Sequence, residues 1–374
     1  MAVRLLSHDV SDLCLGKPVL KSLPITSTVA EALSALKRHG DTFLAVLSTS
    51  DNSSPRLAVV GKVCMVDIVC FLLLDENLTD LPSALRSPLS AVLSKPSDGL
   101  VRQIDRHASL LEALDLILEG AQNLVVPLRQ SSSARKKPIH GEFCWLSQED
   151  VIRFLLGSIG SFSPLPALSV SSLGLVHPDV LTVDYHDPAA SVSALLPLAL
   201  KNQTAIAVVT DGRKLVGEIS PSTLASLRDA SVAAAIATLS TGELMAYIDC
   251  GGPPEDIVRE VKKRLSEKGL NGLLDLLEES MSVMTTSSSS SSSDDEETVT
   301  RGRLQRRKSS GSYSARMRRG SEAIVCQQGS SLMAVMMQAL AHRVGYVWVV
   351  EDDFSLAGVV TFRDILRVFR EHLG

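Results

Sequence analysis

The stretch that decides the fold is Gly358-Val359-Val360-Thr361-Phe362-Arg363-Asp364. Its apolar half predicts a strand at Leu356 to Val360, and its polar half begins a helix from Phe362 to His372. The hydroxyl of Thr361 stands at the junction, with the carboxylate of Asp364 three positions later. Ser or Thr followed three residues later by an acidic side chain is typical of a helix start.

The same strand-to-helix junction recurs three more times along the chain. Ser147-Gln148-Glu149-Asp150 repeats the hydroxyl and the carboxylate. Residues 61–67 keep Gly61 and Asp67 but carry Cys64 at the hydroxyl position. Residues 217–223 keep the glycine and a serine, with threonine in place of the carboxylate. One structural unit is therefore repeated four times.

Working outward from each junction, the same order of elements appears. An amphipathic helix precedes a short apolar strand, a turn, a second strand and the closing helix. We therefore predict an α+β fold of four β-α-β-β-α repeats, at residues 14–75, 93–158, 170–229 and 322–374.

A long insertion separates the third and fourth repeats. Its first part, residues 230–280, predicts helices at Ala230 to Leu239 and Pro254 to Glu267. Its second part, residues 281–321, contains seven consecutive serines, an acidic block and a run rich in arginine. We expect disorder there, because so polar a segment cannot bury enough apolar surface to offset the entropy lost on ordering.

Composition excludes several classes of partner. The chain has 374 residues, 45% hydrophobic and 21% charged, with a net charge of -5, so it has no general attraction for nucleic acid or anionic lipid. Only Tyr313 lies among the arginines of the insertion, which argues against nucleic-acid binding there because few aromatic rings are available for stacking. No apolar run approaches the roughly 18 residues of a membrane span.

The residues of common catalytic and metal sites are also missing from the sequence. The six cysteines form no Cys-x-x-Cys pair, and we read them as buried, reduced thiols. The histidines show no metal spacing, and no nucleophile elbow or phosphate-binding glycine loop is found. With no secretory signal at the start, these features predict a non-catalytic cytoplasmic protein without a metal or resident cofactor.

The repeat with its Gly-x-x-Thr/Ser-x-x-Asp junction resembles the CBS domain, over residues 10–230 and 322–372. This resemblance implies that the four repeats pair into two Bateman modules. Leu5 to Leu13 and the serine-rich insertion resemble the plant stand-alone CBS-domain proteins of the CBSX type. The family implies an adenosyl ligand such as AMP, ADP or ATP, and a homodimer through contacts between modules.

An aspartate one turn into a helix can accept hydrogen bonds from both ribose hydroxyls. The predicted ligand-binding residues are Thr361, Asp364, Gly358, Ser147, Asp150 and Asp67. The pairs Thr361/Asp364 and Ser147/Asp150 are the strongest, since a thiol at Cys64 is a poor substitute for a hydroxyl. A plain helix cap explains the same residues without any ligand.

The predicted function is a non-catalytic regulator that binds an adenosine-containing nucleotide and modulates a partner protein not yet identified. The alternative is a ligand-free scaffold whose disordered insertion recruits partners. Arginines precede Ser309 and Ser321 at spacings that suit a basophilic kinase, and both serines are predicted phosphorylation sites.

Overall fold

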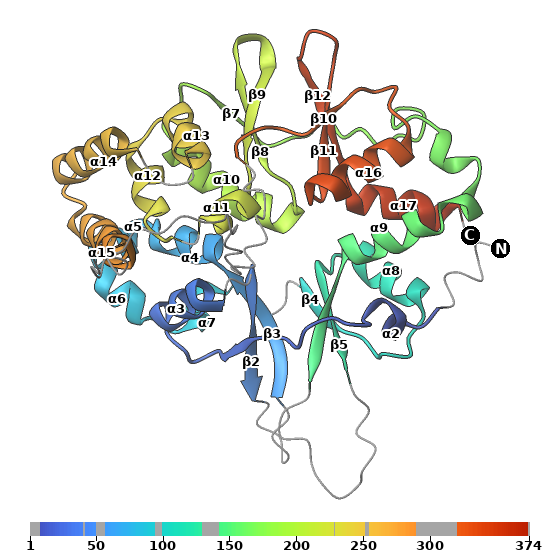
Figure 1. The fold of residues 1–374 in the computed structure, drawn as a ribbon, viewed down its shortest axis with the longest axis horizontal. Helices are drawn as coiled ribbons and strands as arrows, with labels where there is room; N and C mark the ends of the chain where they lie inside the picture. Colours follow the sequence, from blue (N-terminus) through green and yellow to red (C-terminus); the bar gives the residue numbers. More distant parts are fainter. Residues whose placement is uncertain are drawn as a thin grey trace, which may run out of the picture.

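The computed structural model describes residues 8–39, 42–49, 57–93, 99–128, 142–227, 229–250, 254–288 and 320–372. Within these residues the chain forms four small sheets with helices packed between them (Figure 1). The predicted phosphorylation site Ser309 lies outside the described residues, and so does most of the predicted disordered segment.

Each repeat forms its own three-stranded sheet, in which the middle strand is central. The first strand pairs with the second in parallel, and the second pairs with the third antiparallel. The strands are β1 (Ser22–Pro24), β2 (Phe43–Thr49) and β3 (Leu57–Cys64); β4 (Val101–Gln103), β5 (Asn123–Pro127) and β6 (Phe143–Ser147); β7 (Thr182–Asp184), β8 (Ile206–Thr210) and β9 (Lys214–Ile219); and β10 (Val325–Cys326), β11 (Tyr346–Val350) and β12 (Leu356–Thr361). The predicted four-repeat α+β fold is confirmed.

Two helices complete each repeat, one before the central strand and one after the third strand. The first set is α3 (Val29–His39), α8 (Leu110–Leu118), α10 (Ala190–Asn202) and α16 (Leu332–His342), and the closing set is α4 (Met65–Leu72), α9 (Gln148–Gly157), α11 (Pro221–Ser226) and α17 (Phe362–Glu371). Pro197 lies inside α10, and the helix continues through it to Asn202. Short helices α2 (Val10–Leu13), α5 (Asp75–Thr79), α6 (Leu81–Arg86) and α7 (Leu89–Val92), with 3-10 turns η2 (Ile159–Phe162), η3 (Leu165–Ala167) and η4 (Asp211–Arg213), fill the connections.

The glycine of the junction motif lies beside a β-bulge in three of the sheets. Gly61 pairs with Val46 at the position where the register of β2 and β3 shifts, and Gly217 and Gly358 hold the same place in β9 and β12. Such a bulge bends the strand locally and increases its twist. The glycine of the motif therefore coincides with a β-bulge, and in two of these three repeats the hydroxyl that follows it caps the closing helix.

Contacts between sheets join the repeats in pairs along the chain. Repeats 1 and 2 meet where the rings of Phe43 and Trp145 lie edge to face, with centroids 5.3 Å apart. Repeats 3 and 4 meet where the Leu215 amide donates a 3.0 Å hydrogen bond to the Phe354 carbonyl. We call these pairs module 1 and module 2.

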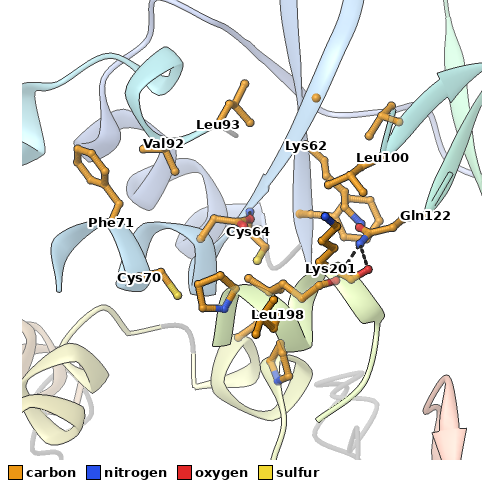
Figure 2. A pocket seen from close by; sticks show the side chains of 18 of the residues that line it. Lys62, Cys64, Cys70, Phe71, Val92, Leu93, Leu100, Gln122, Leu198 and Lys201 are labelled. Carbon is orange, nitrogen blue, oxygen red and sulfur yellow. Dashed lines mark hydrogen bonds between the residues drawn. The ribbon is translucent and has the colours of Figure 1, made fainter. Parts of the chain in front are cut away.

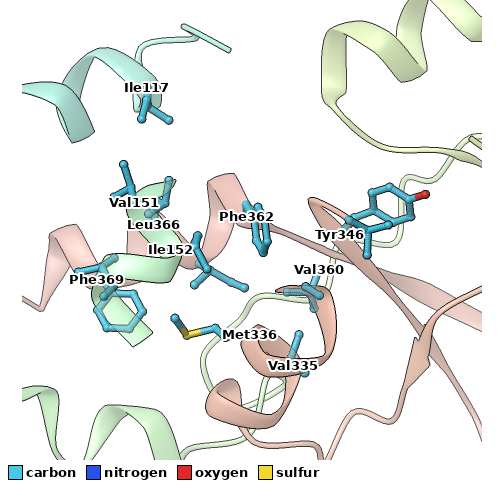
Figure 3. Close-up of a cluster of buried hydrophobic side chains, with 14 of the residues drawn as sticks. Ile117, Val151, Ile152, Val335, Met336, Tyr346, Val360, Phe362, Leu366 and Phe369 are labelled. Atoms are coloured by element: carbon cyan, nitrogen blue, oxygen red, sulfur yellow. The ribbon is translucent and has the colours of Figure 1, made fainter. Parts of the chain in front are cut away.

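Helices join the two modules to each other. α8 and α9 pack against α16 and α17, and the rings of Phe162 and Phe369 meet edge to face with centroids 4.9 Å apart. Figure 3 shows Val151 and Ile152 of α9 beside Leu366 of α17 in this cluster. On the other side, α4 packs against α10, α11 and α12. Repeats 2 and 4 thus share one buried core, which also takes in one face of β8 from repeat 3, and repeats 1 and 3 share the other.

The insertion is more ordered than its sequence predicted. It contains α12 (Val232–Thr238), α13 (Thr241–Asp249), α14 (Glu255–Glu267) and α15 (Asn271–Ser288), of which α13 and α15 were not expected. Helix α15 extends past residue 281, where we had predicted that disorder begins, and it contacts α5 and α6 of repeat 1. A buried alanine-rich face of α12 joins the core of repeats 1 and 3.

Candidate functional site

The strongest predicted pair, Thr361 and Asp364, caps α17. The Asp364 amide donates a 3.3 Å hydrogen bond to Thr361 Oγ1, and that hydroxyl donates to Asp364 Oδ2 at 2.5 Å. The other carboxylate oxygen lies 3.1 Å from both His177 Nε2 and Arg367 Nη1. Asp364 is 6% exposed. Its carboxylate is therefore already engaged by protein groups.

The approach to Gly358 is also occupied. The amide of His177 donates to the Val359 carbonyl at 3.0 Å, and the Val359 amide returns a hydrogen bond at 2.9 Å. A Cβ at Gly358 would lie 2.5 Å from the His177 carbonyl oxygen. This glycine admits a neighbouring backbone segment, where we had predicted a ligand.

Ser147 and Asp150 form a capping box at the start of α9. The amide of Ser147 donates to Asp150 Oδ2 at 2.8 Å, and Lys17 Nζ lies 2.5 Å from the same oxygen. Lys17 also donates to the Trp145 carbonyl at 2.7 Å. The second predicted pair thus holds the N-terminal segment against repeat 2.

In the third repeat, Ser220 caps α11 through the Thr223 amide at 3.0 Å. Thr223 stands where the other repeats carry aspartate, and it is buried. These three motifs therefore share a capping role, and the carboxylates of Asp150 and Asp364 are engaged by other side chains.

Asp67 differs from the other motif residues because it lines a cavity of about 710 Å³. We call this the Asp67 cavity. Its walls come from β3, α4 and α7 of repeat 1, from the start of repeat 2, and from α10 and α11 of repeat 3 (Figure 2). Its volume falls within the range of about 300 to 1,000 Å³ that is usual for small-molecule pockets.

The chain builds this cavity where three repeats meet. Gln122 of repeat 2 donates 2.8 Å hydrogen bonds to the carbonyls of Leu200 and Lys201 at the end of α10. Gly61 forms part of the opposite wall, and Leu93 lies close enough that a Cβ on Gly61 would be 3.1 Å from its methyl group. The walls of the cavity therefore belong to both modules.

Three charged side chains line the Asp67 cavity: Asp67, Lys62 and Lys201. The Cys64 amide donates to Asp67 Oδ2 at 2.7 Å. Lys62 Nζ donates to Asn123 Oδ1 at 2.6 Å and lies 5.1 Å from the centroid of the Phe43 ring. Two ammonium groups and one carboxylate give the walls a net positive charge, which favours an anionic ligand.

Burial shifts the ionisation of the groups in this cavity. Burial raises the pKa of Asp67, although hydrogen bonds from Cys64 and the charge of Lys62 act in the opposite direction. Burial likewise lowers the pKa of Lys62 below its ordinary value. Each pKa shift shows that the charged form of the side chain is poorly solvated in the protein. A polar ligand can supply the missing hydrogen bonds.

Burial raises the pKa of the Cys64 thiol, and it raises the pKa of Cys70 to about 12. Both thiols line the cavity in their neutral form, so neither is an activated nucleophile. The six cysteines are free. Burial was expected for all of them, but Cys64 and Cys70 are only partly buried and Cys250 is exposed.

Lys62, Lys201 and Gln122 were not among the residues predicted from the sequence. One signal was available for Lys62, because a lone charge interrupts the apolar strand Leu57 to Cys64. Lys201 and Gln122 reach the cavity only through the packing of repeats 2 and 3, which no local pattern reveals.

Ser321, the other predicted phosphorylation site, is only 4% exposed. Its hydroxyl donates to Asp249 Oδ2 at 2.7 Å. Among the described residues, no group of three or more metal-ligating side chains is found. None of the helices in the described part of the chain is both long and apolar enough to cross a bilayer.

Comparison with known proteins agrees with this architecture. The CBS domain family matches residues 316–371. The chain is 46% identical to the CBS domain-containing protein CBSX5 of Arabidopsis thaliana, over 100% of this chain and 99% of that protein. The chain belongs to the family of CBS-domain proteins. The match includes the insertion between CBS repeats 3 and 4, because it spans the whole chain.

Two further proteins match this CBS-domain chain over nearly its whole length. The SNF1-related protein kinase regulatory subunit gamma-like PV42b of Arabidopsis thaliana is 22% identical over 99% of this chain and 96% of its own. The crystal structure of protein MJ1225 of Methanocaldococcus jannaschii, described as an archaeal homologue of γ-AMPK, matches with a TM-score of 0.57. It is 16% identical and covers 97% of this chain and 100% of its own, so it supports the fold alone.

Proposed function

We propose that this chain is a non-catalytic regulatory protein that binds an adenosine-containing nucleotide in the Asp67 cavity and transmits its occupancy to a partner protein. The observation that carries the proposal is the juxtaposition of Asp67 with Lys62 and Lys201 around one cavity of about 710 Å³. The relatives support it, since one is named as a regulatory subunit of a protein kinase.

The ligand's parts match the walls of the cavity. The Asp67 carboxylate, one turn into α4, accepts hydrogen bonds from ribose hydroxyls. Lys62 and Lys201 attract the phosphate. Apolar side chains from α7 and α10, among them Val92 and Leu198, cover the base. The net positive lining favours AMP, ADP or ATP over the cationic S-adenosylmethionine.

A ligand in this cavity affects how the helices of module 1 pack against those of module 2. The walls belong to repeats 1, 2 and 3, and α4 packs directly against α10, α11 and α12. A ligand that binds one arrangement of these helices stabilises it by about 2.7 kcal/mol at a hundredfold excess over Kd. Such a shift changes the surface that a partner meets.

A ligand-free scaffold is the second candidate, because side chains of the protein already engage two of the motif aspartates. Asp150 and Asp364 are paired with Lys17, His177 and Arg367, so two of the motif aspartates serve as helix caps. If Asp67 is also only a cap, the repeats hold no nucleotide and the insertion recruits the partner.

Thermal unfolding of the full chain with AMP, ADP, ATP or S-adenosylmethionine separates the two candidates. If the chain binds a nucleotide, the midpoint temperature of unfolding should rise with at least one of AMP, ADP and ATP, and it should rise less with S-adenosylmethionine. No shift with any of the four at millimolar concentration supports the scaffold. A shift with S-adenosylmethionine alone contradicts the role of the two lysines.

A further inference from the structure

Ser321 docks the end of the insertion onto module 2. Its amide donates to Asp249 Oδ1 at 2.6 Å, and its hydroxyl donates to Asp249 Oδ2 at 2.7 Å. Its carbonyl accepts a 2.7 Å hydrogen bond from the Glu218 amide of β9. Both carboxylate oxygens at the end of α13 are thus used to hold this one residue.

The fit around Ser321 leaves no space for a larger group. Gly320 lies directly against the Asp249 carboxylate, where even a Cβ would collide. A Cβ on Gly217 would lie 2.6 Å from the Ser321 carbonyl oxygen. A phosphoryl group on Ser321 would have to occupy the position of Asp249 and would bring about -1.5 to -2 charge next to its carboxylate.

The sequence before Ser321 fits a basophilic kinase, because Arg318 and Arg319 precede it by three and two residues. We propose that Ser321 is a phosphorylation site whose modification releases residues 320–322 from α13 and β9. The kinase forms a bond between Ser321 Oγ and the γ-phosphorus of ATP. The bond from that phosphorus to the leaving oxygen of ADP breaks, and the hydroxyl proton passes to the kinase.

The kinase reaches Ser321 through transient detachment of the segment, since local openings cost less free energy than global unfolding. Phosphorylation then keeps the segment detached, because like charges at hydrogen-bond distance repel. Release exposes the backbone amide of Glu218 on β9. The carboxylate of the same residue accepts hydrogen bonds from Tyr346 and Trp348 of repeat 4. The affected surface is the contact of repeats 3 and 4, apart from the Asp67 cavity.

The test uses the full chain in a Ser309→Ala background, incubated with ATP and a kinase of Arg-Arg-x-Ser specificity. Asp249→Ala removes both acceptors of Ser321 and should speed its phosphorylation by about tenfold or more, since each hydrogen bond to a charged group contributes measurably. Asp256→Ala, on the exposed face of α14, is the matched control and should leave the rate unchanged. Mass spectrometry gives the extent of modification at Ser321.

Hydrogen exchange of the phosphorylated chain supplies the second readout. The amides of Glu218 and Ser321 should exchange at least tenfold faster than in the unmodified chain, while the β11 amides stay protected. Unchanged or slower exchange at both amides after phosphorylation would overturn the proposal. So would equal phosphorylation rates for wild type and Asp249→Ala, with urea unfolding showing that the variant is folded.

Discussion

Lys62 of repeat 1 donates a 2.6 Å hydrogen bond to Asn123, the first residue of β5 in repeat 2. The equivalent residue of module 2 is Glu218, which accepts a 2.7 Å hydrogen bond from Tyr346, the first residue of β11. Each module thus holds one charge at the same place between its sheets, a cation in module 1 and an anion in module 2. The cation lines the Asp67 cavity, so module 1 is suited to an anionic ligand.

Replacing Lys62 tests this assignment. Lys62→Met should weaken AMP binding by about tenfold, because a charge-assisted hydrogen bond to the phosphate is lost. The substitution should also lower the free energy of unfolding by about 1 to 3 kcal/mol, since the buried Asn123 Oδ1 loses its donor. Calorimetric titration measures the affinity, and Lys17→Met, which breaks the Asp150 pair outside the cavity, is the control.

The pH dependence of AMP binding follows from the same lysine. Because burial lowers the pKa of Lys62, its positive charge is lost at a pH below that of an ordinary lysine. Affinity should therefore fall as pH rises through this lowered pKa, and Lys62→Met should lack that fall. An identical alkaline profile in both proteins would assign the effect to another group.

The buried carboxylate of module 2 should matter for stability. Glu218 is 1% exposed and accepts the indole N–H of Trp348 at 2.6 Å. Glu218→Leu leaves that donor buried without its acceptor, at a cost of about 1 to 3 kcal/mol. Urea unfolding followed by tryptophan fluorescence measures the loss, and Glu255→Leu at the exposed start of α14 should change the unfolding free energy far less.

The insertion helices carry a pH-sensitive ion pair. Arg264 on α14 donates to both carboxylate oxygens of Glu243 on α13, at 2.9 and 3.1 Å, and lowers the pKa of Glu243 to about 2. A lowered pKa in the folded state adds stability above the ordinary pKa of 4.5, and this contribution is lost as pH falls toward 2. At this partly exposed site we expect about 1 kcal/mol.

Glu243→Gln should flatten the acid side of the stability curve, since the amide keeps the cap of α13 but loses the charge. Unfolding free energies between pH 5 and the acid limit of folding check this. A wild-type slope retained in the variant would show that other carboxylates dominate.

The sequence predicted the repeats because each strand and helix depends on local periodicity, as in the buried strand Tyr346 to Val350. It also located Thr361/Asp364 and Ser147/Asp150 correctly as helix starts. It ranked these two pairs above Asp67 as ligand sites, but the availability of each carboxylate depends on distant residues such as Lys17 and His177, which engage two of the aspartates. The cavity lies at the motif with cysteine, where no ion pair to the Asp67 carboxylate is found among the described residues.

The insertion illustrates a second limit of local patterns. Helix α13 contains a capping box from Ser240 to Glu243, yet it has only nine residues and follows α12 closely. Its order depends on Tyr185 and Asp187 of repeat 3, whose carbonyls accept hydrogen bonds from the Gly242 and Thr241 amides. Contacts between residues so far apart in sequence are visible only in the folded chain.

Calorimetric titration of AMP into wild type, Asp67→Asn and Asp364→Asn tests the central claim most directly. The account predicts one high-affinity event in the wild type, a loss of about tenfold or more in Asp67→Asn, and affinity within about twofold of wild type in Asp364→Asn. Binding that survives Asp67→Asn and disappears in Asp364→Asn would place the nucleotide at α17 and contradict the assignment of the Asp67 cavity.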